Sequence, residues 1–320
     1  MTNPEAEALP LILAVDLGGT DTKVALVDSR GRVVARETLR TTDFAAAEAL
    51  VAALADVLAR LEVDAGGRAV AVGLGAPNGH HGRGTVEHAP NLAWKGKVPL
   101  RDMLAHATGL PVELDNDANL AALGQGRFGA CKGMEDFVVV TLGTGLGGGI
   151  VAGGQLVRGA SGFAGELGHV LCVRDGRLCG CGRRGCLETY VSARGLVATY
   201  GECVRASSGA PQDSAGVGAP VLVTAVEVHA KAQRGEAAAL AAFAITAAHL
   251  AGALVDLTLL LGPECVAFTG GLTASGETLL GPTRAAYLAQ LPEGTPAAQL
   301  VFSTAPDATL AGAVALVSLA

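Results

Sequence analysis

Basic residues are scarce in this chain, and they are spread thinly along it. The 320 residues include 23 Lys and Arg against 30 Asp and Glu, which gives a formal net charge of −7. Proteins that bind nucleic acid normally gather Lys and Arg into a basic patch, because contacts with the phosphate backbone dominate their affinity. The thin and net negative charge therefore argues against a nucleic-acid partner.

Two common nucleotide-binding motifs are also missing. No G-x-x-x-x-G-K-S/T occurs, which excludes a P-loop protein. No G-x-G-x-x-G opens a helix with an acidic residue about twenty positions further on, which argues against a Rossmann dinucleotide site. Half of the residues are apolar and only 17% are charged, as in a globular chain, and 320 residues are enough for two domains.

The N-terminus and the cysteines both indicate the cytoplasm. The first ten residues, MTNPEAEALP, are acidic and broken by proline, unlike a signal peptide. Four of the seven cysteines have no partner at a recognisable spacing, which is typical of a reducing compartment. These four are Cys131, Cys172, Cys203 and Cys265.

One stretch, residues 237–261, is long enough to span a bilayer. It consists mostly of Ala and Leu, lacks Trp or Tyr anchors, and contains His249 and Asp256. We therefore expect a buried helix of a large domain and no association with a membrane.

Hydrophobic periodicity and turn residues predict an alternation of strands and helices. Strands are expected at 11–15, 22–27, 32–38, 69–75, 112–114, 137–141, 150–152, 265–269 and 300–303. Helices are expected at 42–61, 100–107, 117–128, 224–234, 237–261, 275–291 and 310–319. The Ser-, Gly-, Ala- and Pro-rich residues 207–218 are expected to form an exposed loop without evident chemistry.

A strand, a glycine turn and a second strand occur twice in similar form. The first copy is VDLGGTDTKVALVD, residues 15–28, and the second is VTLGTGLGGGIVAG, residues 140–153. Such a repeat indicates two related α/β domains that face each other across a cleft.

Three glycine turns, at residues 18–20, 143–149 and 270–271, each follow an apolar strand. Glycine allows another group to approach the backbone closely, and successive N–H groups in such a turn can cradle a phosphate. One such turn alone would fit an ordinary hairpin equally well. Three of them, each after a strand, favour phosphate binding.

One histidine and three cysteines follow the second turn at the spacing of a metal site. They are His169, Cys179, Cys181 and Cys186, in the pattern H-x9-C-x-C-x4-C. One imidazole and three thiolates are the ligand composition of a structural zinc site. The alternatives are a disulfide or packed thiols, but a C-x-C disulfide would be strained and no sign of an oxidising compartment is present. We therefore predict Zn²⁺ at these residues.

Around these ligands the chain resembles the ROK family of repressors, open reading frames and sugar kinases. The resemblance is carried by ELGH at 166–169 and CGCGRRGCLE at 179–188, extends from Asp16 to Gly271, and points to the glucokinase-like members. It implies the α/β actin-like ATPase (ribonuclease H-like) fold, with two similar domains and a hinge near residues 124–133. The small domain would comprise residues 1–125, completed by 305–320, and the large domain residues 126–304 with the zinc site.

The resemblance also implies ATP as the phosphoryl donor. The first two turns would hold the ATP phosphates from opposite sides, and the third would leave room for the adenosine. Asp16 would act beside the phosphates through Mg²⁺, which prefers oxygen ligands. The expected ATP-binding residues are Asp16, Gly18, Gly19, Thr20, Lys23, Gly143, Thr144, Gly145, Gly147, Gly270 and Gly271.

A phosphoryl acceptor needs a carboxylate that receives the proton of its hydroxyl. The run Asp115-Asn116-Asp117 ends a predicted strand and opens a predicted helix, where helix capping alone would explain one such residue. Because three polar side chains cluster there, Asp117 is the candidate general base and Asn116 the candidate ligand of a neighbouring hydroxyl. The pair matches the Asn-Asp pair of the family.

A sugar presents several hydroxyls, which carboxylates and amides bind well. The resemblance implies that Glu166, His169 and Glu188 contact the sugar, with one nitrogen of His169 on the sugar and the other on zinc. The two glutamates would otherwise be solvated surface residues. The segment GAPNG departs from the family's Gly-x-Pro-Gly, but asparagine tolerates the same left-handed backbone. The expected sugar-binding residues are Asn78, Gly79, Asn91, Asn116, Asp117, Glu166, His169 and Glu188; His80, His81 and His88 are interpreted as polar loop residues.

Three functions can be weighed from these features. The first is ATP-dependent phosphorylation of a hexose, with glucose at its 6-hydroxyl as the first expectation; mannose, fructose or N-acetylmannosamine as acceptor, and polyphosphate as donor, stay open. The second is a sugar-responsive repressor, which needs a helix-turn-helix domain before the sugar-binding part. The motif of the first glycine turn begins at Asp16 and leaves no room for such a domain. The third, a non-catalytic sugar-binding module, is opposed by Asp117 and the three turns. A homodimer or homotetramer is the family expectation.

Overall fold

The computed structural model describes residues 9–207, 223–303 and 307–318. The loop expected at 207–218 lies outside the described residues from position 208 onward, as do the first eight residues and the last residue of the final expected helix. The chain divides into two compact units. Unit 1 comprises Met1–Gly133, Leu156–Ala164 and Ala305–Ala320, and unit 2 comprises Met134–Gln155 and Gly165–Thr304.

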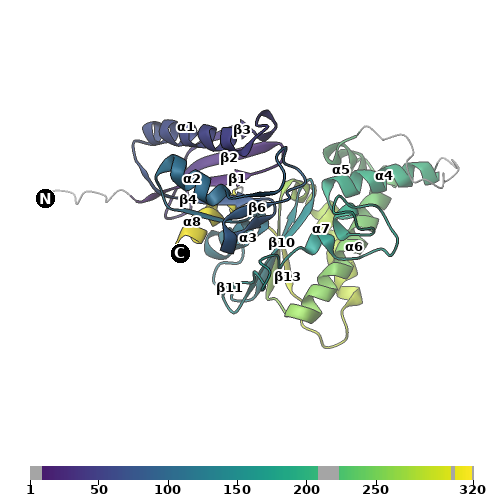
Figure 1. The fold of residues 1–320 in the computed structure, drawn as a ribbon. Coiled ribbons are helices and arrows are strands. Elements are labelled where there is room, and N and C mark those ends of the chain that lie inside the picture. The colour runs from purple at the N-terminus through teal and green to yellow at the C-terminus, as the bar shows by residue number, and fades with distance from the viewer. Residues whose placement is uncertain (1–8, 208–222, 304–306, 319–320) are drawn as a thin grey trace. The chain divides into compact units, whose positions relative to one another are not determined.

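Unit 1 is built around a five-stranded sheet with the order β3-β2-β1-β4-β8 (Figure 1). β1 pairs antiparallel with β2 and parallel with β4, and β4 pairs parallel with β8. The strands are β1 (Leu11–Leu17), β2 (Asp21–Asp28), β3 (Val33–Arg40), β4 (Ala69–Ala76) and β8 (Val112–Asn116). A small second sheet contains β5 (Gly79–His80), β6 (Thr85–Glu87) and β7 (Lys97–Val98).

Helices cover both faces of the sheet in unit 1, because its central strands are apolar on both sides. The helices are α1 (Ala47–Ala65), α2 (Leu100–Thr108), α3 (Asp117–Phe128) and α8 (Ala308–Val317). In β1, Leu13 and Val15 pack with leucines of α1 and α2, whereas Ile12 and Ala14 pack with α3 and α8. This alternation follows the period of two along a strand.

The first helix begins five residues later than the sequence predicts. Residues Thr41–Asp43 form a short 3-10 turn instead, and α1 begins at Ala47. Thr41 is buried, its N–H donates to the carbonyl oxygen of Thr20 at 2.8 Å, and its hydroxyl lies 2.8 Å from that of Thr22. These contacts hold residue 41 at the end of the sheet and delay the helix.

Unit 2 repeats the topology of unit 1. Its sheet has the order β11-β10-β9-β12-β13, again an antiparallel meander followed by two parallel strands. The strands are β9 (Phe137–Leu142), β10 (Leu146–Ala152), β11 (Gln155–Leu156), β12 (Cys265–Thr269) and β13 (Gln299–Phe302). The twofold repeat predicted from the glycine turns is therefore confirmed at the level of strand order.

Four helices accompany this sheet: α4 (Ala193–Ser207), α5 (Ala225–Gln233), α6 (Ala237–Leu261) and α7 (Glu277–Gln290). Three of them are predicted from the sequence, whereas α4 is not. Gly195 and Gly201 lower the helix propensity of α4, but Ser192 stabilises its start by accepting a hydrogen bond from the N–H of Gly195 at 3.0 Å. Packing against α6 then compensates for the weak propensity.

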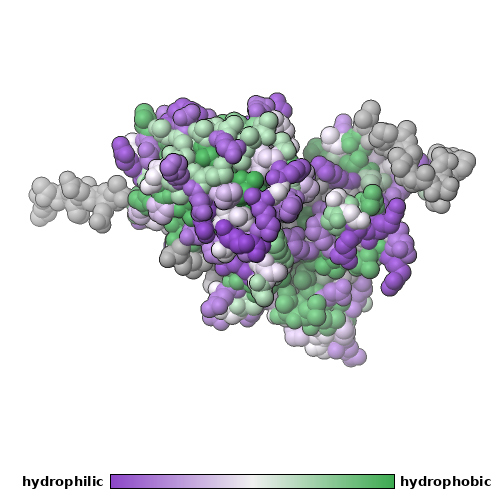
Figure 2. Space-filling view, viewed as in Figure 1, coloured by the Kyte–Doolittle hydropathy of each residue, from purple (hydrophilic) through white to green (hydrophobic). Residues whose placement is uncertain are grey.

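Among the described helices, α6 has the length and composition of a membrane span. It packs against α4 and α7, and Phe243, Leu250 and Leu254 are buried in the core of unit 2. α6 is therefore a core helix of this unit. Its last turn exposes Leu259 and Leu260, and Figure 2 shows hydrophobic surface over that end of the helix.

The boundary between the units also differs from the expectation. A division after residue 125 would cut α3, which continues to Phe128 in unit 1. Residues 156–164 belong to unit 1 although unit 2 precedes and follows them in the chain. The hydrophobic pattern could not reveal this, because it reports strands and helices and not which unit a loop joins.

The contact between α3 and α8 depends on two glycines. A Cβ atom at Gly124 would collide with the carbonyl oxygen of Ala308, and one at Gly312 with that of Leu120. We predict that Gly124→Ala lowers the free energy of unfolding by about 1–3 kcal/mol, because the two backbones must separate. Urea denaturation measures this.

Gly252→Ala is the matched control, since Gly252 lies within α6 and its added Cβ would have only Gln290 Oε1 near it, at 4.0 Å. This variant should gain about 0.5–1 kcal/mol of stability from helix propensity. A Gly124→Ala protein as stable as Gly252→Ala would show that the helices do not need the close contact.

Candidate active site and metal centre

Three parallel strands of unit 1 end at the same edge of its sheet. Their register aligns Asp16 in β1 with Gly75 in β4, and Gly75 with Asp115 in β8. Ligands of parallel α/β sheets bind outside the carboxyl ends of the strands, where the following loops meet. This edge therefore brings together Asp16, the loop after β4 and the start of α3 at Asp117.

The first glycine turn lies beside Asp16 and is tightly packed. A Cβ at Gly18 would lie 2.7 Å from the carbonyl oxygen of Asp21, and one at Gly19 would lie 2.6 Å from Cβ of Asn91. Glycine is needed at both positions because other groups approach the backbone so closely. The turn thus comes into contact with the loop that carries Asn91, another predicted site residue. Lys23 Nζ is 3.8 Å from Asp16 Oδ2.

Asp16 is poorly solvated for a carboxylate, with 21% of its side chain exposed. Burial raises its pKa from 3.8 to about 6, and the negative charges of Asp117 and Asp307 add to this effect, while Lys23 opposes it. A carboxylate destabilised in this way gains from any cation bound beside it. The surroundings of Asp16 therefore suit a residue that acts next to a metal ion.

The three residues of the strand-to-helix junction, Asp115-Asn116-Asp117, have different roles. Asn116 is the N-cap of α3, and both its Oδ1 and Asp117 Oδ1 accept from the N–H of Ala118 at 2.9 Å. The capping interpretation is therefore confirmed for Asn116, and it leaves Asp117 at the first turn of the helix. Asp115 Oδ1 accepts from Asn116 N–H at 2.7 Å and from Asn119 Nδ2 at 2.8 Å.

Arg158 completes this network and was not expected from the sequence. Its Nε donates to Asp115 Oδ2 at 2.7 Å, and Asp115 is almost fully buried. Both oxygens of Asp115 are thus engaged, which makes it an anchor of the junction that presents Asp117. No local signal links Arg158 to a residue 43 positions earlier in the chain, and only the fold brings them together.

The loop after β4 confirms the expected backbone at Asn78. This residue has φ of 52°, in the left-handed region where the family pattern has glycine. Its Nδ2 donates to the carbonyl oxygen of Glu87 at 3.0 Å, and a Cβ at Gly79 would lie 2.6 Å from the carbonyl oxygen of Asp115. Asn78 and Gly79 are thereby held next to the Asp115 junction.

His80 differs from the polar loop residue that the sequence suggests. It is 7% exposed, lies in β5, and its Nε2 is 3.0 Å from the carbonyl oxygen of Ser161. Its ring also contacts Phe163 edge-on. Together with Arg158, His80 therefore holds residues 156–164 onto unit 1. His81 Nδ1 lies 3.0 Å from the carbonyl oxygen of Leu114, and His88 has φ of 51° in the loop before Asn91.

In unit 2, the other two glycine turns lie next to each other. β9 and β12 are parallel neighbours with Thr141 opposite Thr269, so both turns emerge at one edge. Gly270 has φ of 99°, and a Cβ there would lie 2.5 Å from the carbonyl oxygen of Leu142. Only Gly143, Thr144 and Gly145 form the turn itself, because β10 begins at Leu146. Gly147 is therefore a strand residue, and its N–H donates to Thr141 Oγ1 at 3.1 Å.

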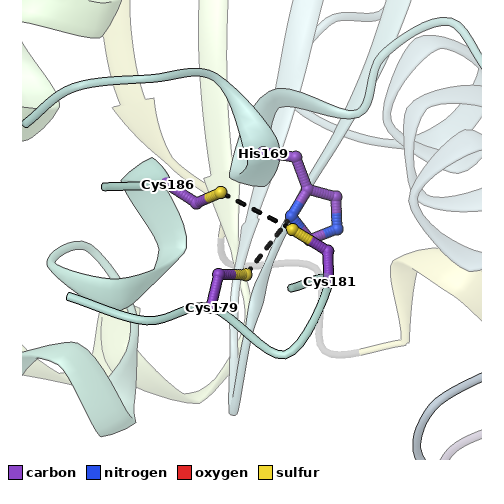
Figure 3. Close-up of side chains that lie close together, drawn as sticks. All are labelled: His169, Cys179, Cys181 and Cys186. Carbon is purple, nitrogen blue, oxygen red and sulfur yellow. Dashed lines mark hydrogen bonds between the residues drawn. The ribbon is translucent and has the colours of Figure 1, made fainter. Parts of the chain in front are cut away.

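The predicted metal ligands of unit 2 converge on one point. One ligand atom each from His169, Cys179, Cys181 and Cys186 lies within 4.8 Å of the others (Figure 3). Cys179 Sγ is 3.6 Å from His169 Nδ1, and Cys181 Sγ is 3.7 Å from Cys186 Sγ. A tetrahedral zinc ion with ordinary bond lengths holds N and S ligands about 3.6 Å apart and S ligands about 3.8 Å apart. The donor set therefore fits zinc in both composition and spacing.

Two glutamates border this cluster. His169 Nε2, the nitrogen not directed at the thiols, is 3.9 Å from Glu166 Oε2, and Glu188 Oε1 is 2.8 Å from Cys179 Sγ. Burial raises the pKa of Glu166, the charge of Glu188 adds to this, and His169 opposes it. A Cβ at Gly145 would lie 3.0 Å from Glu188 Oε2, so Glu188 also reaches the second glycine turn.

Arg177 holds the cysteine loop onto α4 and was missed in the sequence. Its guanidinium lies 4.3 Å from the Tyr190 ring and donates to the carbonyl oxygen of Thr189 at 2.6 Å. It also pairs with Glu202 of α4 at 2.7 Å. This anchor joins the loop of the thiols to the turn that presents Glu188.

Comparison with known proteins identifies the family of the chain. A model of the ROK family matches residues 12–319. The chain belongs to the ROK family. A glucokinase of Streptomyces coelicolor is 37% identical over 87% of this chain and 87% of its own length. An N-acetylmannosamine kinase of Escherichia coli is 33% identical over 95% of this chain and 97% of its own.

Among solved structures, a ROK family glucokinase from Streptomyces griseus in complex with glucose and AMPPNP resembles the chain with a TM-score of 0.80. The two chains are 36% identical, and the match covers 95% of this chain and 98% of the other. This likeness, together with the repeated strand order, confirms the actin-like ATPase fold predicted for this ROK protein.

The raised pKa of Asp16 predicts that replacing this residue increases the stability of the protein, and that the increase depends on pH. A group with a pKa raised in the folded state stabilises the protein at low pH, and this stability is lost as pH rises from about 4 to 6. Asp16→Asn avoids the loss, so at pH 7.5 it should be more stable than wild type by about 1–3 kcal/mol, since each pKa unit corresponds to 1.36 kcal/mol. Urea denaturation without nucleotide or divalent metal measures this.

At pH 4.5 most of this difference should vanish. Asp56→Asn, at an exposed position of α1, is the control and should change stability little at either pH. An equal effect of Asp16→Asn at both pH values would rule out a buried charge as its cause.

Proposed function

We propose that this ROK protein is an ATP-dependent hexose kinase that forms glucose 6-phosphate. The observation that carries the proposal is that Asp117 opens α3 at the same sheet edge as Asp16 and the first glycine turn. A carboxylate for the acceptor proton and a turn for the phosphates thereby lie in one unit. The names of the relatives and the glucose and AMPPNP of the similar structure support the same reaction.

Asp117 acts as the general base in this proposal. It takes the proton of the 6-hydroxyl as that oxygen attacks the γ-phosphorus of ATP, and ADP leaves with the bonding electrons of the broken P–O bond. Asn116 holds a neighbouring hydroxyl, and Asp115, locked by Arg158 and Asn119, keeps the junction rigid. Asn78, Gly79 and Asn91 complete the sugar contacts of unit 1.

Unit 2 supplies the remaining contacts. The hexose hydroxyls form hydrogen bonds with Glu166, His169 and Glu188. His169 uses its Nε2 atom, which lies next to Glu166. Gly143, Thr144 and Gly145 bind phosphates by their backbone, and Gly270 and Gly271 leave space for the adenosine. In unit 1, Gly18, Gly19, Thr20 and Lys23 bind phosphates from their own side.

Two metal ions belong to the proposal. His169, Cys179, Cys181 and Cys186 would hold a structural Zn²⁺. The ion would keep the ring of His169 in one orientation and would not serve to activate water. Asp16 would hold Mg²⁺, which would supply positive charge to the transferred phosphoryl group. We also propose a cytoplasmic homodimer or homotetramer with no nucleic-acid or membrane partner.

Replacement of the base should separate binding from turnover. Asp117→Asn keeps the size and most hydrogen bonds of the side chain, so glucose should bind within about threefold of wild type while kcat falls by about 10² or more. A coupled assay for ADP, with calorimetry for glucose affinity, measures both. Asp56→Asn should match wild type in both assays.

A panel of glucose, mannose, fructose and N-acetylmannosamine, each with ATP or polyphosphate, tests the reaction itself. Glucose with ATP should give the highest kcat/KM. Phosphorylation of none of these sugars would end the kinase proposal, and a wild-type kcat in Asp117→Asn would end the assignment of the base.

Removal of one thiol should affect the sugar through His169. Cys181→Ser should abolish stoichiometric zinc and weaken glucose binding by about tenfold or more, because a metal ligand that also binds substrate loses its orientation. Elemental analysis and calorimetry measure the two effects. Cys203→Ser, in α4 and outside the ligand set, should keep both. Unchanged glucose affinity in metal-free protein would contradict the coupling.

A further inference from the structure

The loop at residues 88–96 is held together by one lysine side chain. Lys95 Nζ donates to three backbone carbonyl oxygens, those of Ala89 at 3.1 Å, Pro90 at 3.0 Å and Leu92 at 2.7 Å. An ammonium group has three donors, and here all three find acceptors within the loop. The loop is closed at its base by a hydrogen bond from His88 N–H to the carbonyl oxygen of Gly96 at 2.8 Å.

The tip of this loop contacts the first glycine turn. Ala89 and Leu92 are buried in unit 1, whereas Asn91 between them is exposed. An added Cβ at Gly19 would lie 2.6 Å from Cβ and 3.0 Å from the carbonyl oxygen of Asn91. Lys95 therefore restrains the part of the loop that covers the turn, while the two buried residues keep the loop attached to the unit.

We propose that Lys95 is a positioning residue, which fixes residues 89–92 so that Asn91 stays against Gly19 and meets the hexose in a single orientation. The proposal rests on the hexose kinase function proposed above. Without the ammonium, the three carbonyls lose the donor that they share, and the segment that carries them is no longer held in one conformation. The loop then orders only when the sugar binds, and the entropy cost of that ordering lowers the affinity.

The three convergent acceptors fit the donor geometry of lysine better than that of arginine. An ammonium directs its three donors outward from a single nitrogen, whereas the guanidinium spreads its donors over a planar fork. Arginine keeps the charge at position 95 but cannot direct one nitrogen at all three oxygens. Lys95→Arg therefore distinguishes the geometry of the contact from the charge alone.

The first test is the division of the effect between KM and kcat. Lys95→Ala should raise KM and Kd for glucose about tenfold, which is the loss of one to two hydrogen bonds, with kcat within about threefold of wild type. Lys95→Arg should lie close to Lys95→Ala. Lys97→Ala is the matched control, since Lys97 is also exposed and pairs at 3.5 Å with Glu87, which keeps its ion pair with Arg83 at 2.7 Å. This control should behave as wild type.

Chemical rescue is the second test, because it responds only if the ammonium group itself holds the loop. Ammonium or propylammonium chloride at tens of millimolar supplies donors to the vacated site of Lys95→Ala and should restore several-fold of the lost glucose affinity. Sodium chloride at equal ionic strength should restore none, and neither salt should change wild type or Lys97→Ala.

Loop order can be measured without any sugar. Trp94 is the single tryptophan of the sequence and lies next to Lys95, so its emission and acrylamide quenching report on this loop. Lys95→Ala should increase quenching and speed amide hydrogen exchange at His88 and Leu92, whose N–H groups donate within the loop. Exchange in α6 should not change.

The outcomes separate the two proposals. If wild type phosphorylates no hexose but Lys95→Ala still loosens the loop, the kinase function fails and the structural half of the inference stands. If wild type is a kinase, then unchanged glucose Kd, unchanged quenching or full recovery in Lys95→Arg would each overturn the role of Lys95.

Discussion

Parallel pairing of β1, β4 and β8 is the constraint on which the candidate site of unit 1 depends. It places Asp16, Gly75 and Asp115 in one row, so three loops that are distant in sequence leave the sheet together. The strands could not pair in this way without cover on both faces, and the two pairs of helices supply it. In unit 2 the same pairing of β9 with β12 brings the second and third glycine turns together.

Two carboxylates at this edge, those of Asp115 and Asp16, have opposite electrostatic surroundings. Asp115 is compensated by Arg158, Asn119 and the backbone, and it is therefore a fixed part of the scaffold. Asp16 has Lys23 Nζ 3.8 Å from its Oδ2, but burial and the charges of Asp117 and Asp307 outweigh this cation and leave Asp16 destabilised as an anion. Functional sites commonly retain such unfavourable groups, because the ligand relieves them. The contrast supports the proposal that Asp16 acts beside a bound cation, whereas Asp115 supports the junction.

Much of this arrangement could be predicted from the sequence, because the relevant signals are local. The limits of α6 and β12, the cap at Asn116, the left-handed Asn78 and the repeated strand-turn-strand units follow from periodicity and turn chemistry. Ligand spacing also indicated the cluster of His169 with three cysteines. Arg158 and Arg177 were not predicted, since the fold brings each near partners that are distant in the sequence. Lys95 was not predicted either, because its partners are backbone carbonyls of its own loop and the residue types there do not reveal such contacts. The helix α4 was missed because its glycines hide a helix that tertiary packing stabilises.

The glycine contact of α8 with α3 has a consequence for biosynthesis. α8 packs on the first sheet, yet the ribosome synthesises it only after all of unit 2 has been made. Until then, that face of the sheet has α3 but not α8 to cover Ile12 and Ala71, which the finished protein buries. Unit 1, although most of it is translated first, therefore completes its core only when the end of the chain has been made.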